Sequence, residues 1–198
     1  ISLDLETTGL NPSEDKIIEI SAIRFLDGKP TDFFTKLINP NTLINPIAIE
    51  ITGITDDMVK NKPDFSEIEE EFISFIGQFP IVGQNILFDL SFLKKYLNNY
   101  DLLFRERMIC DTYYLAKIFH YNKNYFNLTS LCKTFNISID NAHRAESDAK
   151  NTGFLFLSIV RTILEKYTNP ILFQKLSNCI KLFDVPNYKF FKIALKFF

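Results

Sequence analysis

The 198-residue sequence has no tryptophan, only three cysteines and two histidines, and no apolar run that approaches the length of a membrane span. The missing run rules against a transmembrane helix, which needs about 20 consecutive apolar residues. Cys110, Cys132 and Cys179 are odd in number and widely separated, so they indicate neither a disulfide framework nor the spacing of zinc ligands. We expect buried thiols in a reducing compartment, the cytoplasm.

An excess of charge of either sign is also missing. The chain has 22 lysine and arginine residues against 24 aspartate and glutamate residues, for a formal net charge of -2. This balance argues against a protein that holds nucleic acid on a broad basic surface. Two bound divalent ions would make the net charge of the protein positive, so the composition does not exclude an enzyme that binds phosphate through metal ions. The hydrophobic fraction of 46%, with 21 phenylalanines, indicates a globular chain with a substantial core.

The one credible domain boundary lies at Pro170, where the character of the sequence changes. We expect one domain over residues 1–168 and, over 169–198, a helical and aromatic extension or the start of a linker to a further domain. Lysines alternate with aromatic residues in this extension, which fits docking, nucleic-acid contact or packing on the core; we favour a structural or linking role. No basic segment leads into an apolar one at the start, so we expect no signal peptide and a chain cut from a longer replication or repair protein.

The order of apolar patterns predicts an α/β fold, with a mixed five-stranded sheet flanked by helices. Period-two alternation or a short buried run predicts strands at 1–6, 16–26, 33–38, 80–83 and 108–111. Helical spacing predicts helices at 66–79, 88–98, 112–119, 127–135 and 146–167. Ser66 and Glu69 have the spacing of a capping box. Residues 39–62 are expected to form a long connection with one helical turn. The buried stripe of the last helix is expected at Ala149, Phe156, Val160, Ile163 and Tyr167.

Asp4 and Glu6 alternate with apolar residues in the first predicted strand. Successive side chains of a strand point to opposite faces, so the two carboxylates share a face. Such a pair repels itself, and a hard divalent cation such as magnesium or manganese is the simplest compensation. A solvent-facing pair on an edge strand is the common alternative for an isolated D-x-E pattern, so the rest of the chain must decide.

Two later stretches carry further candidate residues. Asp89 follows the buried strand at 80–83 and lies near the start of a helix, where sites on open α/β sheets gather. Interaction with the helix dipole is its alternative role. His143 precedes the last helix and Asp148 lies in its first turns, so both can reach the same space. An imidazole can take a proton from water near neutral pH, which makes His143 a candidate general base beside the alternative of a surface or capping residue.

The order and spacing of these residues resemble a known family. D-x-E-T-T-G in the first strand, N-x-x-x-D in the middle and H-x-x-x-x-D on a late helix resemble the three motifs of the DnaQ-like 3′-5′ exonucleases of the DEDDh type. The resemblance covers residues 1–168. It implies a ribonuclease H-like fold and a two-metal hydrolysis of phosphodiesters that releases nucleoside 5′-monophosphates.

The resemblance also implies the role of each motif residue. His143 corresponds to the general base, which orients a water molecule and accepts its proton. The metal ligands, for two Mg²⁺ or Mn²⁺ ions, correspond to Asp4, Glu6, Asp89 and Asp148. Four carboxylates would balance the charge of two divalent ions.

Substrate contacts are expected around the same motifs. Backbone N–H groups near Thr7 and Thr8 could meet the terminal nucleotide, and Leu10 resembles an apolar wedge against the last base. Phe88 could line the same pocket, although core packing is favoured in a chain this rich in phenylalanine. Asn85 could hydrogen-bond near the substrate or cap the following helix.

Other charged residues near the motifs are expected to have no catalytic role. Glu19 and Glu146 are interpreted as structural acids, since neither matches a motif position. Lysine and arginine side chains near the motifs are interpreted as ordinary solvated cations, of which one or two could meet phosphate; these are Lys94, Lys95, Arg144 and Lys150.

The leading hypothesis is a 3′-5′ exonuclease that acts on single-stranded or frayed DNA ends in replication, repair or proofreading. A second hypothesis keeps the site and changes the substrate to short RNA or transfer-RNA ends, because the discriminating 2′-hydroxyl contact is a detail of the pocket. A third is a noncatalytic interaction module, which an idle cluster of mutually repelling carboxylates disfavours. Such domains occur attached to polymerases and helicases, so we expect a polymerase or helicase in the same chain or complex, and no membrane.

Overall fold

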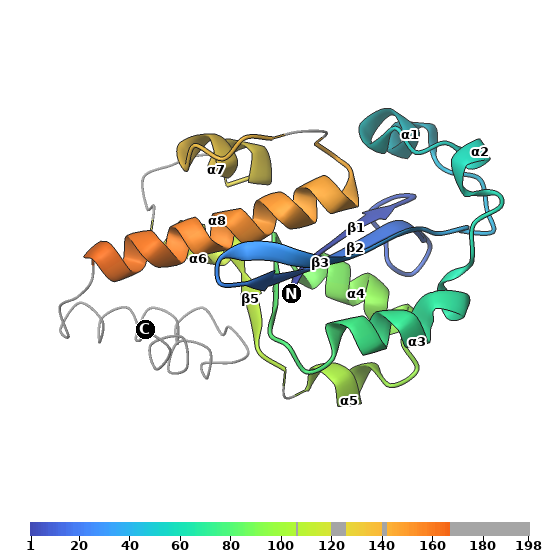
Figure 1. Cartoon of the computed structure of the whole chain (residues 1–198). Coiled ribbons are helices and arrows are strands. Elements are labelled where there is room, and N and C mark those ends of the chain that lie inside the picture. The colour runs from blue at the N-terminus through green and yellow to red at the C-terminus, as the bar shows by residue number, and fades with distance from the viewer. Residues whose placement is uncertain (106, 120–125, 140–141, 167–198) are drawn as a thin grey trace.

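A computed structural model describes residues 1–105, 107–119, 126–139 and 142–166 (Figure 1). Its centre is a five-stranded sheet in the order β3-β2-β1-β4-β5. The antiparallel part consists of β1 (Ser2–Thr7), β2 (Ile17–Leu26) and β3 (Lys29–Leu37). Parallel pairing with β1 adds β4 (Ile81–Gly83), and parallel pairing with β4 adds β5 (Ile109–Asp111). The predicted α/β class with a mixed five-stranded sheet is confirmed.

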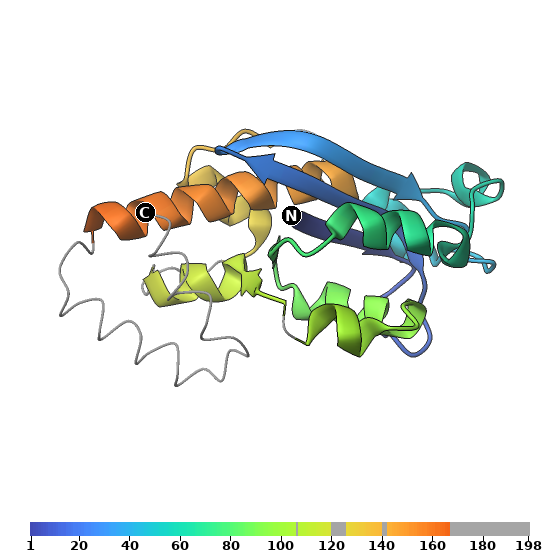
Figure 2. The same ribbon diagram turned by 60° about the horizontal axis from the view of Figure 1, so that its bottom comes forward.

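The helices cover both faces of this sheet. On one face α8 packs on β1 and β2, and α6 and α7 pack against α8. On the other side lie α3, α4 and α5 (Figures 1 and 2). The helices of the described residues are α1 (Pro46–Thr52), α2 (Asp56–Val59), α3 (Phe65–Ile76), α4 (Leu87–Tyr96), α5 (Tyr100–Phe104), α6 (Thr112–Phe119), α7 (Leu128–Thr134) and α8 (Ala145–Lys166).

The alternation of side chains along β1 separates the apolar core from the opposite face of the sheet. Leu3 and Leu5 join the core that includes residues of α3 and α4. Ser2 faces the other way, and its hydroxyl donates to the carbonyl oxygen of Ala149 on α8 at 2.5 Å. Because residues two apart on a strand share a face, the side chains at positions 4 and 6 also face α8. This placement confirms the predicted pairing of the two carboxylates.

Three predictions about the order and bounds of the elements need correction. β3 begins at Lys29 rather than at residue 33, because Asp27 and Gly28 form a tight turn with φ of 49° and 76° and pairing resumes at once. Glycine and aspartate tolerate this left-handed backbone better than most residues. The segment 39–62 holds α1 and α2 rather than a single helical turn, and α5 has no counterpart among the predicted helices.

The cap of α3 also differs from the prediction. The Asp64 carboxylate accepts the backbone N–H groups of Ser66 at 2.8 Å and Glu67 at 3.3 Å. The Glu67 carboxylate in turn accepts the backbone N–H of Asp64 at 2.9 Å. The capping box is therefore formed by Asp64 and Glu67, and the predicted box of Ser66 and Glu69 is wrong.

The buried stripe of α8 is displaced by one position from the prediction in the middle of the helix. Leu155 and Ile159 are fully buried, whereas Phe156 and Val160 are partly exposed. Phe156 and Val160 instead line a pocket at the start of β1. The ends of the stripe are confirmed where they are described, because both Ala149 and Ile163 are buried.

The cysteines fit the expected role as far as they are described. Cys110 and Cys132 are buried free thiols, and burial raises the pKa of Cys132 to about 11. Cys179, Tyr167 and the extension 169–198 lie outside the described residues, so the expectations for them stay predictions. Among the described helices, none combines the length and apolar character that crossing a membrane requires.

The α3 cap generates a first prediction. Asp64→Ala should lower the free energy of unfolding by about 1 kcal/mol, because two N–H groups of the first helical turn lose their acceptor. Ser66→Ala, at the position favoured by the sequence pattern, should cost less, since the Asp64 cap remains. Urea unfolding followed by circular dichroism measures both. A larger loss for Ser66→Ala than for Asp64→Ala would contradict the assignment of the cap.

Candidate functional site

Three carboxylates from two elements meet between β1 and α8. Asp4 and Glu6 project from β1, and Asp148 projects from the first turns of α8. One oxygen atom from each side chain can be chosen so that the three lie within 4.8 Å of one another. All three residues are partly exposed, which leaves an ion or substrate access to them.

A fourth carboxylate, that of Asp89, is held beside this cluster by the backbone of β1. Asp89 lies in the first turn of α4, is 3% exposed, and accepts the backbone N–H of Leu5 at 3.0 Å. The pairing of β1 with β4 is confined to Ser2, so backbone groups further along that edge need another partner. The side chain of Asp89 supplies one. The alternative in which Asp89 only interacts with a helix dipole therefore does not account for its position.

His143 and Asp148 are joined through the backbone. His143 has a positive φ of 64°, and its N–H donates to Asp148 Oδ2 at 3.1 Å. The bond fixes one oxygen of the carboxylate at the entrance to α8. His143 itself is exposed, whereas Asp89 is buried.

Burial, followed by neighbouring negative charge, raises the pKa of each of the four carboxyl groups. Burial raises the pKa of Asp4 well above its ordinary value, and the charges of Asp89 and Glu6 raise it further. Burial and then the charge of Asp148 raise the pKa of Glu6 to about 8. Burial also raises the pKa of Asp89 and that of Asp148.

This donor set fits divalent metal ions. Carboxylate oxygens are the ligands that Mg²⁺ and Mn²⁺ prefer in proteins. Neighbouring carboxyl groups repel one another when all of them are ionised, and a cation that lies between them offsets this repulsion. The predicted metal ligands thus lie together, three in one cluster and Asp89 beside Asp4.

The turn that follows β1 exposes Leu10. The Asp15 carboxylate accepts the Thr8 hydroxyl at 3.1 Å and the Asn11 N–H at 2.8 Å, and Gly9 leaves the space that this carboxylate occupies. Leu10 is 84% exposed at the tip of this turn, as a wedge requires. The Thr8 N–H donates to the carbonyl oxygen of Lys16 at 2.8 Å, and a contact of Thr8 with the terminal nucleotide stays a prediction.

Thr7 also contributes to the turn, because its hydroxyl donates to the carbonyl oxygen of Gly9 at 2.6 Å. Its contact with substrate stays a prediction. Asn85 has a positive φ of 56° and is exposed, and no side chain caps α4, so the capping alternative for Asn85 is wrong. Phe88 is partly exposed and its ring centroid lies 5.0 Å from that of the fully buried Phe92. Phe88 therefore packs on the core, and a further contact with substrate stays a prediction.

Sequence reasoning missed Asp111, a supporting acid of this site, and interpreted Glu19 as a structural acid. Asp111 ends β5, and its Oδ1 accepts the backbone N–H groups of Asn85 and Tyr113, each at 2.9 Å. Its place at the carboxyl end of a strand beside β4 was an available signal. Glu19 lies opposite Glu6 in the ladder of β1 and β2. Its proximity depends on the register of the hairpin, which no local pattern reveals.

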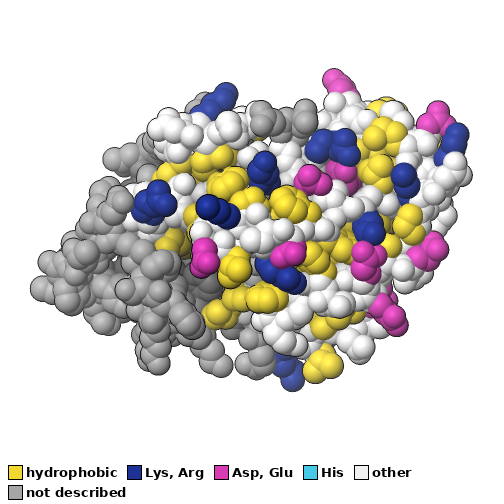
Figure 3. All heavy atoms as spheres, viewed as in Figure 1, with side chains coloured by type: hydrophobic (Ala, Val, Ile, Leu, Met, Phe, Trp, Pro, Cys, Tyr) yellow, Lys and Arg dark blue, Asp and Glu magenta, His cyan; other side chains and the backbone are white. Residues whose placement is uncertain are grey.

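The surface agrees with the near-neutral composition. Figure 3 shows lysine and arginine side chains scattered among acidic and apolar ones, without a continuous basic area on this face.

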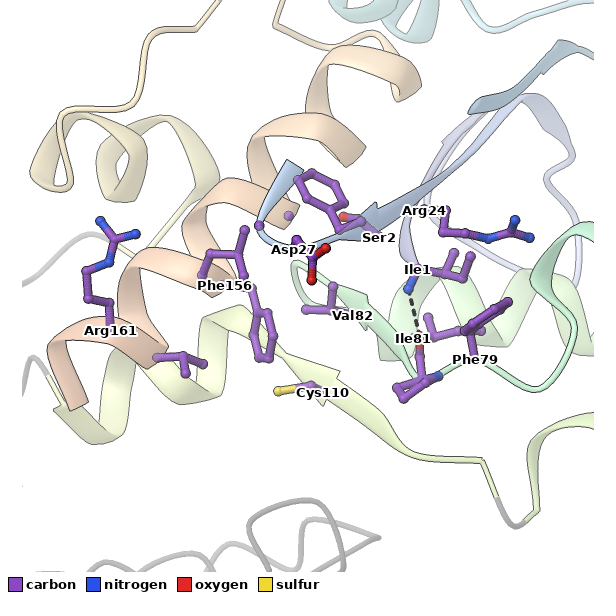
Figure 4. Close-up of a pocket in the computed structure, with 16 residues that line it drawn as sticks. Ile1, Ser2, Arg24, Asp27, Phe79, Ile81, Val82, Cys110, Phe156 and Arg161 are labelled. Atoms are coloured by element: carbon purple, nitrogen blue, oxygen red, sulfur yellow. Dashed lines mark hydrogen bonds between the residues drawn. The ribbon is translucent and has the colours of Figure 1, made fainter. Parts of the chain in front are cut away.

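A separate pocket of about 670 Å³ lies at the start of β1 (Figure 4). Ile1, whose amino group donates to the carbonyl oxygen of Pro80 at 2.8 Å, and Phe156 lie in its wall. None of the four candidate metal ligands lines this pocket, so it is distinct from the acidic site.

Comparisons with known proteins agree with the geometry. The family model RNase T, described as exonuclease, matches residues 1–156. DNA polymerase III PolC-type of Halalkalibacterium halodurans is 34% identical over 166 residues, a match that covers 84% of this chain and 12% of the relative. The 3′-5′ exonuclease DinG of Bacillus subtilis is 35% identical over 164 residues, covering 82% of this chain and 18% of the relative. The chain thus spans less than a fifth of the length of these two curated relatives.

A solved structure shows the same fold with higher mutual coverage. Exonuclease X in complex with 5′ overhanging duplex DNA has a TM-score of 0.63 and 27% sequence identity to this chain. The match covers 81% of this chain and 90% of that one. The likeness therefore extends over most of both chains.

The raised pKa values generate a second prediction. In EDTA the free energy of unfolding should fall as pH rises from 4.5 to about 8, because Glu6 holds its proton more tightly in the folded state than in the unfolded state. Glu6→Gln removes this titration and should flatten the dependence on pH. Glu70→Gln, at an exposed position on α3, is the matched control and should keep the wild-type slope. Equal slopes for all three proteins would contradict the assignment.

Proposed function

Because the chain belongs to the RNase T exonuclease family and is a 3′-5′ exonuclease of the DEDDh type, we propose that it removes nucleotides from the 3′ ends of single-stranded or frayed DNA. The products are nucleoside 5′-monophosphates. The observation that carries this proposal is the meeting of Asp4, Glu6 and Asp148 within 4.8 Å, with Asp89 held beside them.

In this proposal the four carboxylates hold two Mg²⁺ or Mn²⁺ ions. When bound, such ions lower the pKa of a water molecule and stabilise negative charge on the attacking and leaving oxygens of the phosphodiester. Asp4 and Glu6 are suited to this role because they are presented side by side by a strand. Asp89 and Asp148 are suited because each has one oxygen fixed by a backbone N–H, of Leu5 and His143 respectively.

His143 acts as the general base. Its imidazole orients the attacking water and accepts its proton, and imidazole is the side chain best suited to proton transfer near neutral pH. The exposed position at the start of α8 supports this role, because an entering water and the departing proton both need access to solvent. The bond from its N–H to Asp148 holds the base next to the carboxylate cluster.

Leu10 supplies an apolar contact for the terminal base. Leu10 is exposed on a turn that hydrogen bonds to Asp15 stabilise. This supports the role, because a side chain that packs against a base needs a rigid backbone beneath it. Contact with the flat face of a base is tolerant of sequence, as an exonuclease requires. Thr7, Asn85 and Phe88 are proposed to line the same end of the substrate.

DNA is preferred to RNA in this proposal on the basis of the relatives. One is a DNA polymerase and one solved structure is a complex with DNA. The match to a small part of a polymerase supports a further proposal, that the chain works in replication or repair with a polymerase or helicase in the same chain or complex.

Two substitutions separate metal binding from proton transfer. Asp4→Asn should lower the rate of strand degradation by several orders of magnitude, because a metal ligand is lost. His143→Asn should lower it by about 10²–10⁴-fold and keep Mn²⁺ binding, because only the base is removed. Asparagine suits this position because it tolerates the left-handed backbone of His143. Degradation of labelled oligonucleotides and Mn²⁺ titration by electron paramagnetic resonance measure the two effects. Loss of Mn²⁺ binding in His143→Asn would show that the role of His143 is wrong.

The substrate is tested with matched strands. Single-stranded DNA and RNA oligonucleotides of the same sequence, labelled at the 5′ end, should be shortened from the 3′ end, with the DNA strand degraded faster. A 3′-phosphorylated DNA strand serves as a control for the required free end. Faster degradation of RNA would replace the proposed DNA substrate by the ends of short RNA or transfer RNA.

A further inference from the structure

An ion pair between the buried Glu19 and the partly exposed Arg144 lies next to the carboxylate cluster and takes no part in the proposed chemistry. Glu19 on β2 is 1% exposed and lies opposite Glu6 in the ladder of β1 and β2. Arg144 donates from Nε to Glu19 Oε2 at 3.1 Å and from Nη2 to Oε1 at 2.5 Å. The backbone N–H of Ala145 donates to the same Oε2 at 2.8 Å.

The contacts of Glu19 distinguish it from the candidate metal ligands. Both of its oxygens are engaged by hydrogen bonds, and it does not belong to the cluster of three carboxylates. The guanidinium of Arg144 compensates its charge in bidentate geometry, which is the strong form of such a pair. A fifth uncompensated carboxylate here would add to the repulsion in the site, so the pairing has an electrostatic function as well.

The position of the pair in the chain matters more than its energy. Arg144 directly follows His143, and Ala145 is the first residue of α8, the helix that carries Asp148. N–H groups of a first helical turn have no partner within the helix, and Glu19 accepts one of them from the neighbouring strand. The junction between His143 and α8 is therefore fastened directly to the sheet.

Two contacts thus hold α8 to the strands at the level of the site. Ser2 binds the carbonyl oxygen of Ala149, one residue after Asp148. Glu19 binds the junction before the helix through Arg144 and Ala145. Together they set the distance between the carboxylates of β1 and the carboxylate of α8.

We propose that Glu19 and Arg144 are positioning residues of the nuclease site, which hold His143 and Asp148 in register with Asp4 and Glu6 on β1. The inference rests on the proposed metal-dependent function. The pair touches neither metal nor substrate. It acts through the geometry of the ligand set, in the way that residues hydrogen-bonded to metal ligands generally do.

The test uses the full chain with Glu19→Gln, Arg144→Lys and the double variant. Glutamine keeps the shape of Glu19 and an acceptor for Ala145 but loses the ion pair. Lysine keeps a positive charge beside Glu19 but cannot reproduce the two-pronged contact. Arg144→Lys is the milder change, because the Arg144 side chain is 38% exposed while that of Glu19 is 2% exposed. Thermal unfolding by circular dichroism establishes that each variant is folded.

Matched controls lie away from the site. Arg161→Lys makes the same change at an exposed position on the same helix. Asp32→Asn removes the charge of an exposed, ion-paired acid on β3. Both controls should leave metal binding and the rate of degradation unchanged.

Mn²⁺ binding without nucleic acid, measured by electron paramagnetic resonance, is the decisive readout. Each single variant should weaken Mn²⁺ binding by about 10–100-fold. The double variant should bind Mn²⁺ with the same affinity as the single variant that binds it less tightly, because both substitutions break the same contact. At saturating Mn²⁺ the KM for a single strand should stay at the wild-type value.

Two results would overturn the inference while leaving the proposed function intact. Wild-type Mn²⁺ affinity with lowered thermal stability in both single variants would mean that the pair only supports the fold. A raised KM with unchanged Mn²⁺ affinity would mean that Arg144 contacts phosphate, from a pocket of about 510 Å³ that it lines with Lys150. A wild-type protein that binds no Mn²⁺ and degrades no strand would instead overturn the proposed function, and the positioning role with it.

Discussion

The burial of four carboxylates close to one another is the constraint on which the rest of this structure depends. Burial and neighbouring charge raise the pKa of every one of them. Left alone, such groups would separate or take up protons. The fold prevents separation by fixing their supports, with Asp4 and Glu6 on the central strand, Asp89 against the N–H of Leu5, and Asp148 against the N–H of His143.

The arrangement is possible because the two faces of β1 have different roles. Leu3 and Leu5 are buried in the core on one face, which anchors the strand by apolar burial. The opposite face is left for polar side chains and for α8. Because β4 pairs with β1 only at Ser2, the edge beyond is open to the side chain of Asp89. A short neighbouring strand is thus a requirement of the site.

The sequence predicts most of the candidate site residues that the structure brings together, since their signals are local. Strand alternation places Asp4 and Glu6 together, and the start of a long helix places His143 near Asp148. The Glu19–Arg144 pair could not be predicted, because it depends on a pairing register and on residues more than a hundred positions apart. Short helices such as α1 and α2 span too few residues to show a period. The cap of α3 was misplaced because Asp64 and Ser66 both precede suitably spaced glutamates.

Thermal unfolding of the wild type and Asp4→Asn, each with EDTA and with Mn²⁺, tests the central claim most directly. If the carboxylates repel one another in the absence of metal and bind Mn²⁺ jointly, Mn²⁺ raises the Tm of the wild type and leaves that of Asp4→Asn nearly unchanged. In EDTA the variant should be at least as stable as the wild type, because it lacks a carboxyl group whose ionisation is disfavoured by burial and by the charges of Asp89 and Glu6. Equal stabilisation of both proteins by Mn²⁺, or a less stable variant in EDTA, would contradict the account.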